Sequence, residues 1–137
     1  LSSHLIHDLH RLPHHLRGTP SDALAALRRR GERVDETFEE HWLSCTGDTS
    51  PAVFDSVPEL FESHVLVVEC TFLGAGHEAR ARRFRHVHLE DLVAVRDRFA
   101  NRAVVLYHLS RRHRIDEARA AVADRLAGLV PEVHVVG

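Results

Sequence analysis

Ser44-Cys45-Thr46-Gly47-Asp48-Thr49-Ser50-Pro51 connects a strand-like segment to a helix-like one. The residues that lead into it, His41–Cys45, have the pattern of a strand, and the glycine permits a tight turn. The hydroxyl residues after the turn can cap a helix, and the proline suits its first position. Because α/β folds bind ligands outside the carboxyl ends of their strands, Asp48 is the first candidate site residue.

A second strand-like run, Ala103–Leu106, is followed by Tyr107-His108-Leu109-Ser110. An aspartate and a histidine at neighbouring strand ends are typical of a metal site. Taken alone, however, Asp48 is more often a turn or helix-cap residue. His108 alone is more often a strand-end histidine with satisfied hydrogen bonds.

Length and composition are those of one globular domain. The chain has 137 residues, of which 44% are hydrophobic and 28% charged. Its formal charge of -2 excludes an overall positive charge that would attract nucleic acid. No apolar run approaches the roughly 20 residues that a membrane-spanning helix needs. The chain begins at Leu1 and contains no methionine, so we expect it to be part of a longer protein. Cys45 and Cys70 each lie in a strand-like run, which favours buried reduced thiols and a cytoplasmic setting.

The first 18 residues are rich in histidine and have no clear period. His7 and His10 are three positions apart and would share a helix face, which allows a metal clamp. A polar surface segment is the favoured interpretation. After it, Ala23–Arg30 is rich in helix formers and is closed by Gly31, which predicts a short helix.

Strands and helices are predicted to alternate over the rest of the chain. His64–Cys70 is a nearly continuous apolar run, as in buried parallel strands. Pro58 predicts two short helices before it instead of one. The remaining predicted elements are a loop with a helical portion over Leu73–Arg85, a helix from Leu89, a strand ending at Tyr107, a helix opened by Asp116 and a strand over Glu132–Val136. This alternation predicts an α/β fold with a mostly parallel sheet.

Glu69 interrupts the apolar run near its end. A buried carboxylate needs a partner or an ion, because an unpaired buried charge is too costly to keep. An arginine such as Arg80 could pair with it. The neighbouring Cys70 is predicted to be an inert buried thiol, and His88 to be a helix cap or a packing residue.

Four segments carry a family resemblance as an ordered set: Gly47-Asp48-Thr49, Val68-Glu69-Cys70-Thr71-Phe72-Leu73, His86-Val87-His88 and Tyr107-His108-Leu109-Ser110-Arg111-Arg112. They resemble the C-terminal half of the metallo-β-lactamase superfamily, most closely its ribonuclease Z-like branch. The resemblance implies an αββα sandwich with a mixed sheet and flanking helices. Residues 1–137 would then be a single or partial domain, with the N-terminal metal-motif half of the fold absent.

The resemblance also implies roles for the matching residues. Asp48 looks like a metal-bridging carboxylate, and His108 like a late histidine ligand. Glu69 and His86 resemble the pair in which the glutamate orients the imidazole and the imidazole donates a proton to the leaving group. Arg112, together with Ser110, would bind an anionic group of the substrate.

The activity implied by the resemblance is that of a binuclear zinc hydrolase, with manganese as the other candidate metal. Its substrate would be RNA or another anionic ester. A thioester or lactone hydrolase of the same superfamily, and a metal-free binding or dimerisation module, are the alternatives, and a homodimer is among the expected assemblies. Because the family's His-x-His-x-Asp-His signature does not occur here, we expect this chain alone to bind metal weakly and to be inactive.

Overall fold

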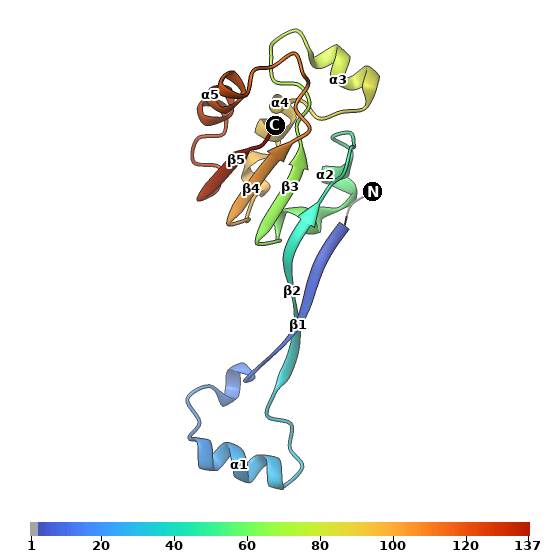
Figure 1. Ribbon diagram of the computed structural model, residues 1–137. Helices are drawn as coiled ribbons and strands as arrows, with labels where there is room; N and C mark the ends of the chain where they lie inside the picture. The colour runs from blue at the N-terminus through green and yellow to red at the C-terminus, as the bar shows by residue number, and fades with distance from the viewer. Residues whose placement is uncertain (1–2) are drawn as a thin grey trace. The chain divides into compact units, whose positions relative to one another are not determined.

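The structure is a computed structural model that describes residues 3–137. It contains two compact units (Figure 1). The larger one comprises His41–Gly137 together with the start of the chain up to Leu5, and the smaller one comprises Ile6–Glu40. The sequence-based prediction of a single or partial domain over residues 1–137 stays a prediction.

One five-stranded sheet runs in the order β1-β2-β3-β4-β5. Its strands are β1 (Ser3–Arg11), β2 (Glu36–Cys45), β3 (Val65–Glu69), β4 (Ala103–Tyr107) and β5 (Glu132–Val135). The pairs β2–β3, β3–β4 and β4–β5 are all parallel. The arrow of β1 runs opposite to that of β2 (Figure 1), so the sheet is mixed and the predicted α/β class is confirmed.

Short helices connect the strands. They are η1 (His14–Leu16), α1 (Ser21–Arg29), α2 (Val53–Ser56), η2 (Pro58–Phe61), α3 (Glu78–Phe84), α4 (Leu89–Ala94), η3 (Arg96–Arg98) and α5 (Ile115–Arg125). The predicted break at Pro58 is confirmed, because α2 ends at Ser56 and η2 begins at the proline. Among residues 3–137, every helix is too short or too polar to cross a lipid bilayer.

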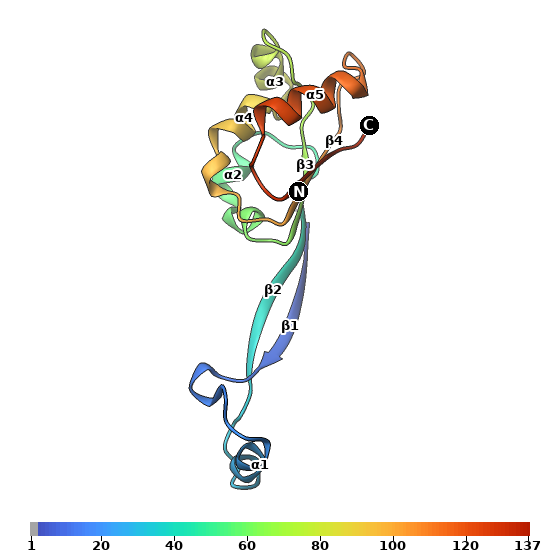
Figure 2. The same ribbon diagram turned by 90° about the vertical axis from the view of Figure 1, so that its left-hand side faces the viewer.

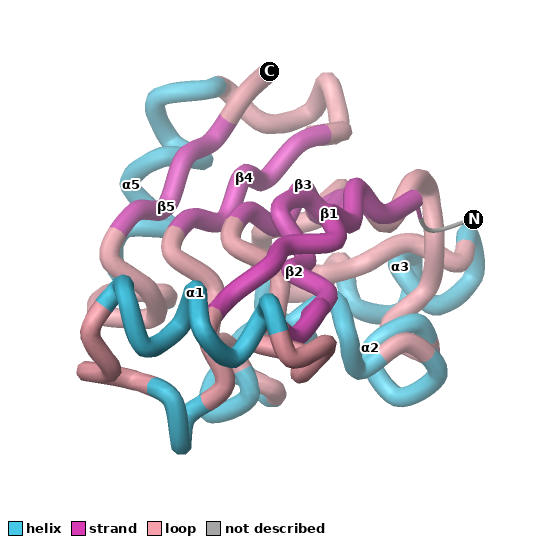
Figure 3. Tube along the Cα trace, turned by 90° about the horizontal axis from the view of Figure 1, so that it is seen from below, coloured by secondary structure: helices cyan, strands magenta, loops and turns pink. Residues whose placement is uncertain are grey.

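The hydrophobic core lies on one face of strands β3 to β5. Leu66 and Val68 of β3 and Leu106 of β4 are fully buried there, together with apolar side chains of α2, η2, α4 and α5. Helices α2 and α4 lie on the same side of the sheet (Figure 2). Within the larger unit, Figure 3 shows α2 below the sheet and α5 beside β5, while loops border the upper side. Among the described residues of the larger unit, one face of this part of the sheet is therefore left without a helix.

Strand β1 shows how the N-terminal histidines are arranged. Residues 3–11 form strand β1, and most of its side chains are exposed, so the predicted polar surface segment has a regular strand structure that cross-strand contacts support. Arg11 donates a hydrogen bond to Glu36 at 2.8 Å, and His10 lies 3.5 Å from Asp35. The metal clamp of His7 and His10 was wrong, since residues three apart in a strand point to opposite faces.

Candidate functional site

The candidate site lies where three neighbouring parallel strands end. Strand β2 ends at Cys45 and leads to Asp48, β3 ends at Glu69, and β4 ends at Tyr107 just before His108. The register pairs Glu69 with Tyr107, which brings these ends to one edge of the sheet. The tertiary structure therefore gathers residues that are far apart in the sequence, at the edge where α/β folds place ligands.

Glu69 is the buried centre of this edge. Its carboxylate accepts hydrogen bonds from the backbone N–H of Thr49 at 3.1 Å and from His86 Nδ1 at 2.9 Å. It also accepts from the backbone N–H of Thr71 at 3.2 Å and from the Thr71 hydroxyl at 2.7 Å. An ionised carboxylate only accepts, so these donors suit its charged form. Pairing with Arg80 was the wrong alternative, since that arginine is exposed on α3 and His86 is the partner.

His86 is presented to Glu69 by the end of α3. The helix ends at Phe84 and is capped by Arg85, which has left-handed backbone angles, and the backbone N–H of His86 then donates to the carbonyl of Ala81 at 2.9 Å. Because Nδ1 donates to Glu69, Nε2 is the nitrogen left for a substrate or another ligand. The imidazole ring lies 5.1 Å from the ring of His108, measured between centroids.

His108 follows β4 with a strained backbone. Its φ is 63°, a left-handed value that is uncommon for a residue with a side chain. The Thr71 hydroxyl lies 2.9 Å from its Nδ1, and Asp48 Oδ2 lies 3.5 Å from its Nε2. Such strain persists only where surrounding contacts fix the backbone, and it is often found at functional sites.

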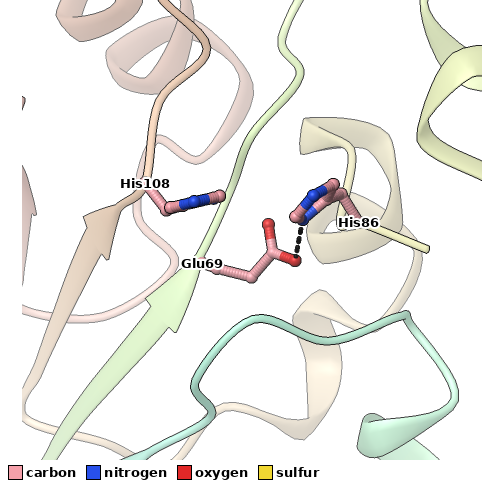
Figure 4. Close-up of side chains that lie close together, drawn as sticks. All are labelled: Glu69, His86 and His108. Carbon is pink, nitrogen blue, oxygen red and sulfur yellow. Dashed lines mark hydrogen bonds and ion pairs between the residues drawn. The ribbon is translucent and has the colours of Figure 1, made fainter. Parts of the chain in front are cut away.

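Exposure increases across the site. Glu69 has a fully buried side chain, whereas the side chains of His86, His108 and Asp48 are 22%, 41% and 59% exposed. The carboxylate of Glu69 lies between the two imidazole rings (Figure 4). Ligand atoms of Glu69, His86 and His108 lie within 4.8 Å of one another, a spacing that a metal site would allow, although both Glu69 oxygens already accept hydrogen bonds from protein groups. The arrangement can hold a cation at an open rim and transfer a proton nearby.

Other predicted residues surround this group. Ser110 follows His108, and its backbone N–H donates to the carbonyl of Thr71 at 3.0 Å. Arg112 is exposed, and its backbone N–H lies 3.5 Å from Ser110 Oγ. Neither side chain bonds to Glu69 in the described part of the chain, so their substrate roles stay predictions.

Two flanking residues behave as the sequence predicted. His88 caps α4, because its side chain accepts from the backbone N–H of Glu90 and its own N–H donates to Asp91. Burial raises the pKa of the Cys70 thiol, with the charge of Glu69 adding to the effect, so this thiol is inert. Burial also raises the pKa of Tyr107 to about 12, and the phenol stays protonated.

Reasoning from the sequence missed Thr49 and Thr71 as partners of Glu69. The backbone N–H of Thr49 reaches the carboxylate only because the turn after β2 folds over the end of β3. A weak signal for Thr71 was available, since a hydroxyl residue two positions after a strand-end carboxylate can fold back onto it.

Comparison with known proteins was made by sequence and by structure. No protein-family profile matches the chain. A tRNase Z of Arabidopsis thaliana is 28% identical over 109 residues, which cover 77% of this chain and 39% of that protein. The chain thus spans about two fifths of the length of this curated relative.

Two solved structures have the same fold as most of the chain. A long-form RNase Z from yeast matches with a TM-score of 0.51 and 21% identity, over 74% of this chain and 13% of that one. A metallo-β-lactamase-fold protein from Bacillus subtilis matches with a TM-score of 0.54 and 18% identity, over 75% of this chain and 41% of that one. This chain is therefore similar in sequence to a tRNase Z, and it shares its fold with an RNase Z and with a metallo-β-lactamase-fold protein.

Proposed function

We propose that this chain is part of a metal-dependent hydrolase that cleaves a phosphodiester bond of RNA. The observation that carries the proposal is the buried Glu69–His86 pair beside the open Asp48–His108 pair. The first pair suits proton transfer and the second suits metal binding. The likeness to a plant tRNase Z supports RNA as the substrate class.

The donor atoms present fit part of a zinc site. Asp48 Oδ2 and His108 Nε2 are partly exposed, close together, and of the types that zinc binds. Glu69 does not fit as a ligand, because both of its oxygens already accept hydrogen bonds from protein groups. A catalytic zinc usually has three protein ligands, so we propose that Asp48 and His108 hold zinc, or manganese, together with residues elsewhere in the protein.

His86 and Glu69 then have separate tasks. A bound metal would supply an activated water and stabilise negative charge on the attacked phosphate. Glu69 accepts the Nδ1 proton of His86, which fixes the orientation of the ring. We propose that His86, in its imidazolium form, donates the Nε2 proton to the leaving oxygen of the substrate. Arg112, four residues after His108, would contact a phosphate of the substrate.

The helix-free sheet face supports a further part of the proposal. Val65 and Val67 of β3 and Ala103 and Val105 of β4 alternate with core residues, so they point to that face. All four are apolar and only partly buried. We propose that the rest of the same protein packs on this face and brings the missing metal ligands. The two free cysteines support a reducing, cytoplasmic setting.

An RNA cleavage assay on the complete protein that carries this segment tests the proposal. We expect His86→Ala to lower kcat by about 10²- to 10⁴-fold with unchanged metal content, because it removes only the proton donor. Asp48→Ala should lower both metal content and activity. His15→Ala, at an exposed histidine of the smaller unit, is the matched control and should change neither.

The same assay separates the alternatives. Turnover of a thioester or lactone without RNA cleavage would favour the small-molecule hydrolase and contradict the RNA proposal. A complete protein that holds no zinc or manganese would favour the metal-free binding module instead.

A further inference from the structure

Thr71 has one hydroxyl group and two partners for it. Thr71 Oγ1 lies 2.7 Å from Glu69 Oε2 and 2.9 Å from His108 Nδ1. The backbone N–H of Thr71 donates to the same carboxylate oxygen at 3.2 Å, and the residue is buried. Its side chain is therefore held in place between the end of β3 and the residue that follows β4.

The chemistry of the two partners sets the direction of both hydrogen bonds. The ionised carboxylate of Glu69 can only accept, so the single hydroxyl proton of Thr71 goes to it. Thr71 Oγ1 must then accept from His108, which requires the proton of the neutral imidazole to be on Nδ1. His108 Nε2 is left with its lone pair, facing the open rim 3.5 Å from Asp48 Oδ2.

We infer that Thr71 is a positioning residue that sets the tautomer of His108 and so prepares Nε2 as a metal ligand. A neutral histidine binds a metal through the nitrogen without a proton, and the contact at the other nitrogen decides which one that is. Glu69 thus supports both imidazoles, His86 directly and His108 through Thr71. The metal-binding consequence rests on the proposed function, but the tautomer does not.

Nitrogen-15 NMR of the labelled chain without metal tests the tautomer directly. At about pH 8, above the usual histidine pKa, long-range proton–nitrogen correlations show which ring nitrogen carries the proton. The signals of His108 are assigned by their absence in His108→Gln. We expect the Nδ1–H form in the native chain and in Thr71→Ser, which keeps the hydroxyl. In Thr71→Val, which keeps the shape and removes the hydroxyl, we expect a loss of this form.

Thr49→Val is the matched control, because its hydroxyl contacts Ser50 and not His108, while its backbone N–H still reaches Glu69. It should leave the tautomer unchanged. An Nε2–H form of His108 in the native chain would overturn the inference, even if Thr71→Val failed to fold. An unchanged Nδ1–H form in a folded Thr71→Val variant would overturn it as well.

Zinc affinity of the complete protein, measured by competition with a chelator, tests the consequence. We expect Thr71→Val to weaken binding by about 10- to 100-fold and Thr71→Ser to restore most of it. Equal affinity of Thr71→Val and the native protein would overturn the role of Thr71 toward the metal. If the native protein bound no zinc, the proposed function would fail, whereas the tautomer would still be decided by the NMR measurement.

Discussion

Glu69 combines two properties that rarely occur together, complete burial and negative charge. The cost of burying a carboxylate is high unless its oxygens are fully hydrogen-bonded. Here two backbone N–H groups, a hydroxyl and an imidazole meet this need. Glu69 therefore links β3 to the turn after β2 and to the segment after α3, and it is the most deeply buried residue of the candidate site.

The Glu69→Gln variant should be less stable by about 1 to 3 kcal/mol, because the amide nitrogen of glutamine cannot accept from the donors that remain. The free energy of unfolding, measured with urea, checks this. Glu62→Gln, at an exposed position, is the control and should change stability little. Equal stability of Glu69→Gln and the native chain would show that the buried donors are satisfied in another way.

His113 should make stability depend on pH. Burial lowers the pKa of His113, the charge of His77 lowers it further, and the backbone N–H of Leu73 donates to its Nε2. The unfolded chain therefore binds more protons at His113 than the folded chain does. The contribution of His113 to stability is complete above the unfolded pKa of about 6.5, and it is lost as the pH falls toward the lower folded pKa.

In His113→Gln we expect a smaller fall of the unfolding midpoint between about pH 7 and pH 5. Thermal unfolding followed by circular dichroism at both pH values measures this. His134→Gln, at an exposed histidine, should keep the native slope. The same slope in His113→Gln as in the native chain would contradict the assignment.

The helices around the site are short, and the residues at their ends determine where the side chains of the site lie. The left-handed residue Arg85 ends α3 and turns the chain so that His86 faces Glu69. The next helix, α4, begins at once with the capping box of His88 and Asp91. Arg82 of α3 donates two hydrogen bonds to Asp91, which joins the two helices. A change at these caps should therefore affect stability and also the position of His86.

His88→Ala should destabilise the chain by about 2 to 4 kcal/mol, because it removes the cap of α4, a hydrogen bond to the carbonyl of Gly74 and a buried ring. His88→Asn keeps an oxygen that can cap and should recover about 1 kcal/mol. Urea denaturation compares the two variants. An equal loss in both would show that the cap contributes little.

At the scale of the larger unit, helices of its described residues cover strands β3 to β5 on one face only. Val67 and Val105 are cross-strand neighbours on the face without a helix. A contiguous apolar patch on a sheet is a common protein interface or a cause of aggregation. This chain on its own should therefore associate with itself as its concentration rises.

The double variant Val67→Thr and Val105→Thr should lower this association with little loss of stability, because threonine keeps the β-branched shape and adds a hydroxyl. Sedimentation velocity over a range of concentrations measures the effect. Val68→Thr, on the buried face of the same strand, is the contrast and should destabilise the fold. A native chain that stays monomeric at every concentration would contradict the prediction.

Local sequence was sufficient for much of the fold. The strands β3 and β4 were predictable because their apolar runs are nearly continuous, and the break at Pro58 because proline cannot continue a helix. The family resemblance supplied Asp48, Glu69, His86 and His108 as candidates, and the structure brings all four to one edge. Strand β1 was missed because its residues show no period, and contacts with β2 support it.

By itself, the sequence determined which strands are buried and which polar residues end them, since hydrophobic period, turn residues and caps act between near neighbours in the chain. The tertiary structure confirmed the pairing of Glu69 with His86, which the resemblance had implied, and it alone decided that Thr71 joins Glu69 to His108. The contact of Thr71 with His108 joins residues that are 37 positions apart, and the register of β3 with β4 brings them together. No local pattern specifies that register, because it follows from how the whole sheet packs on its core.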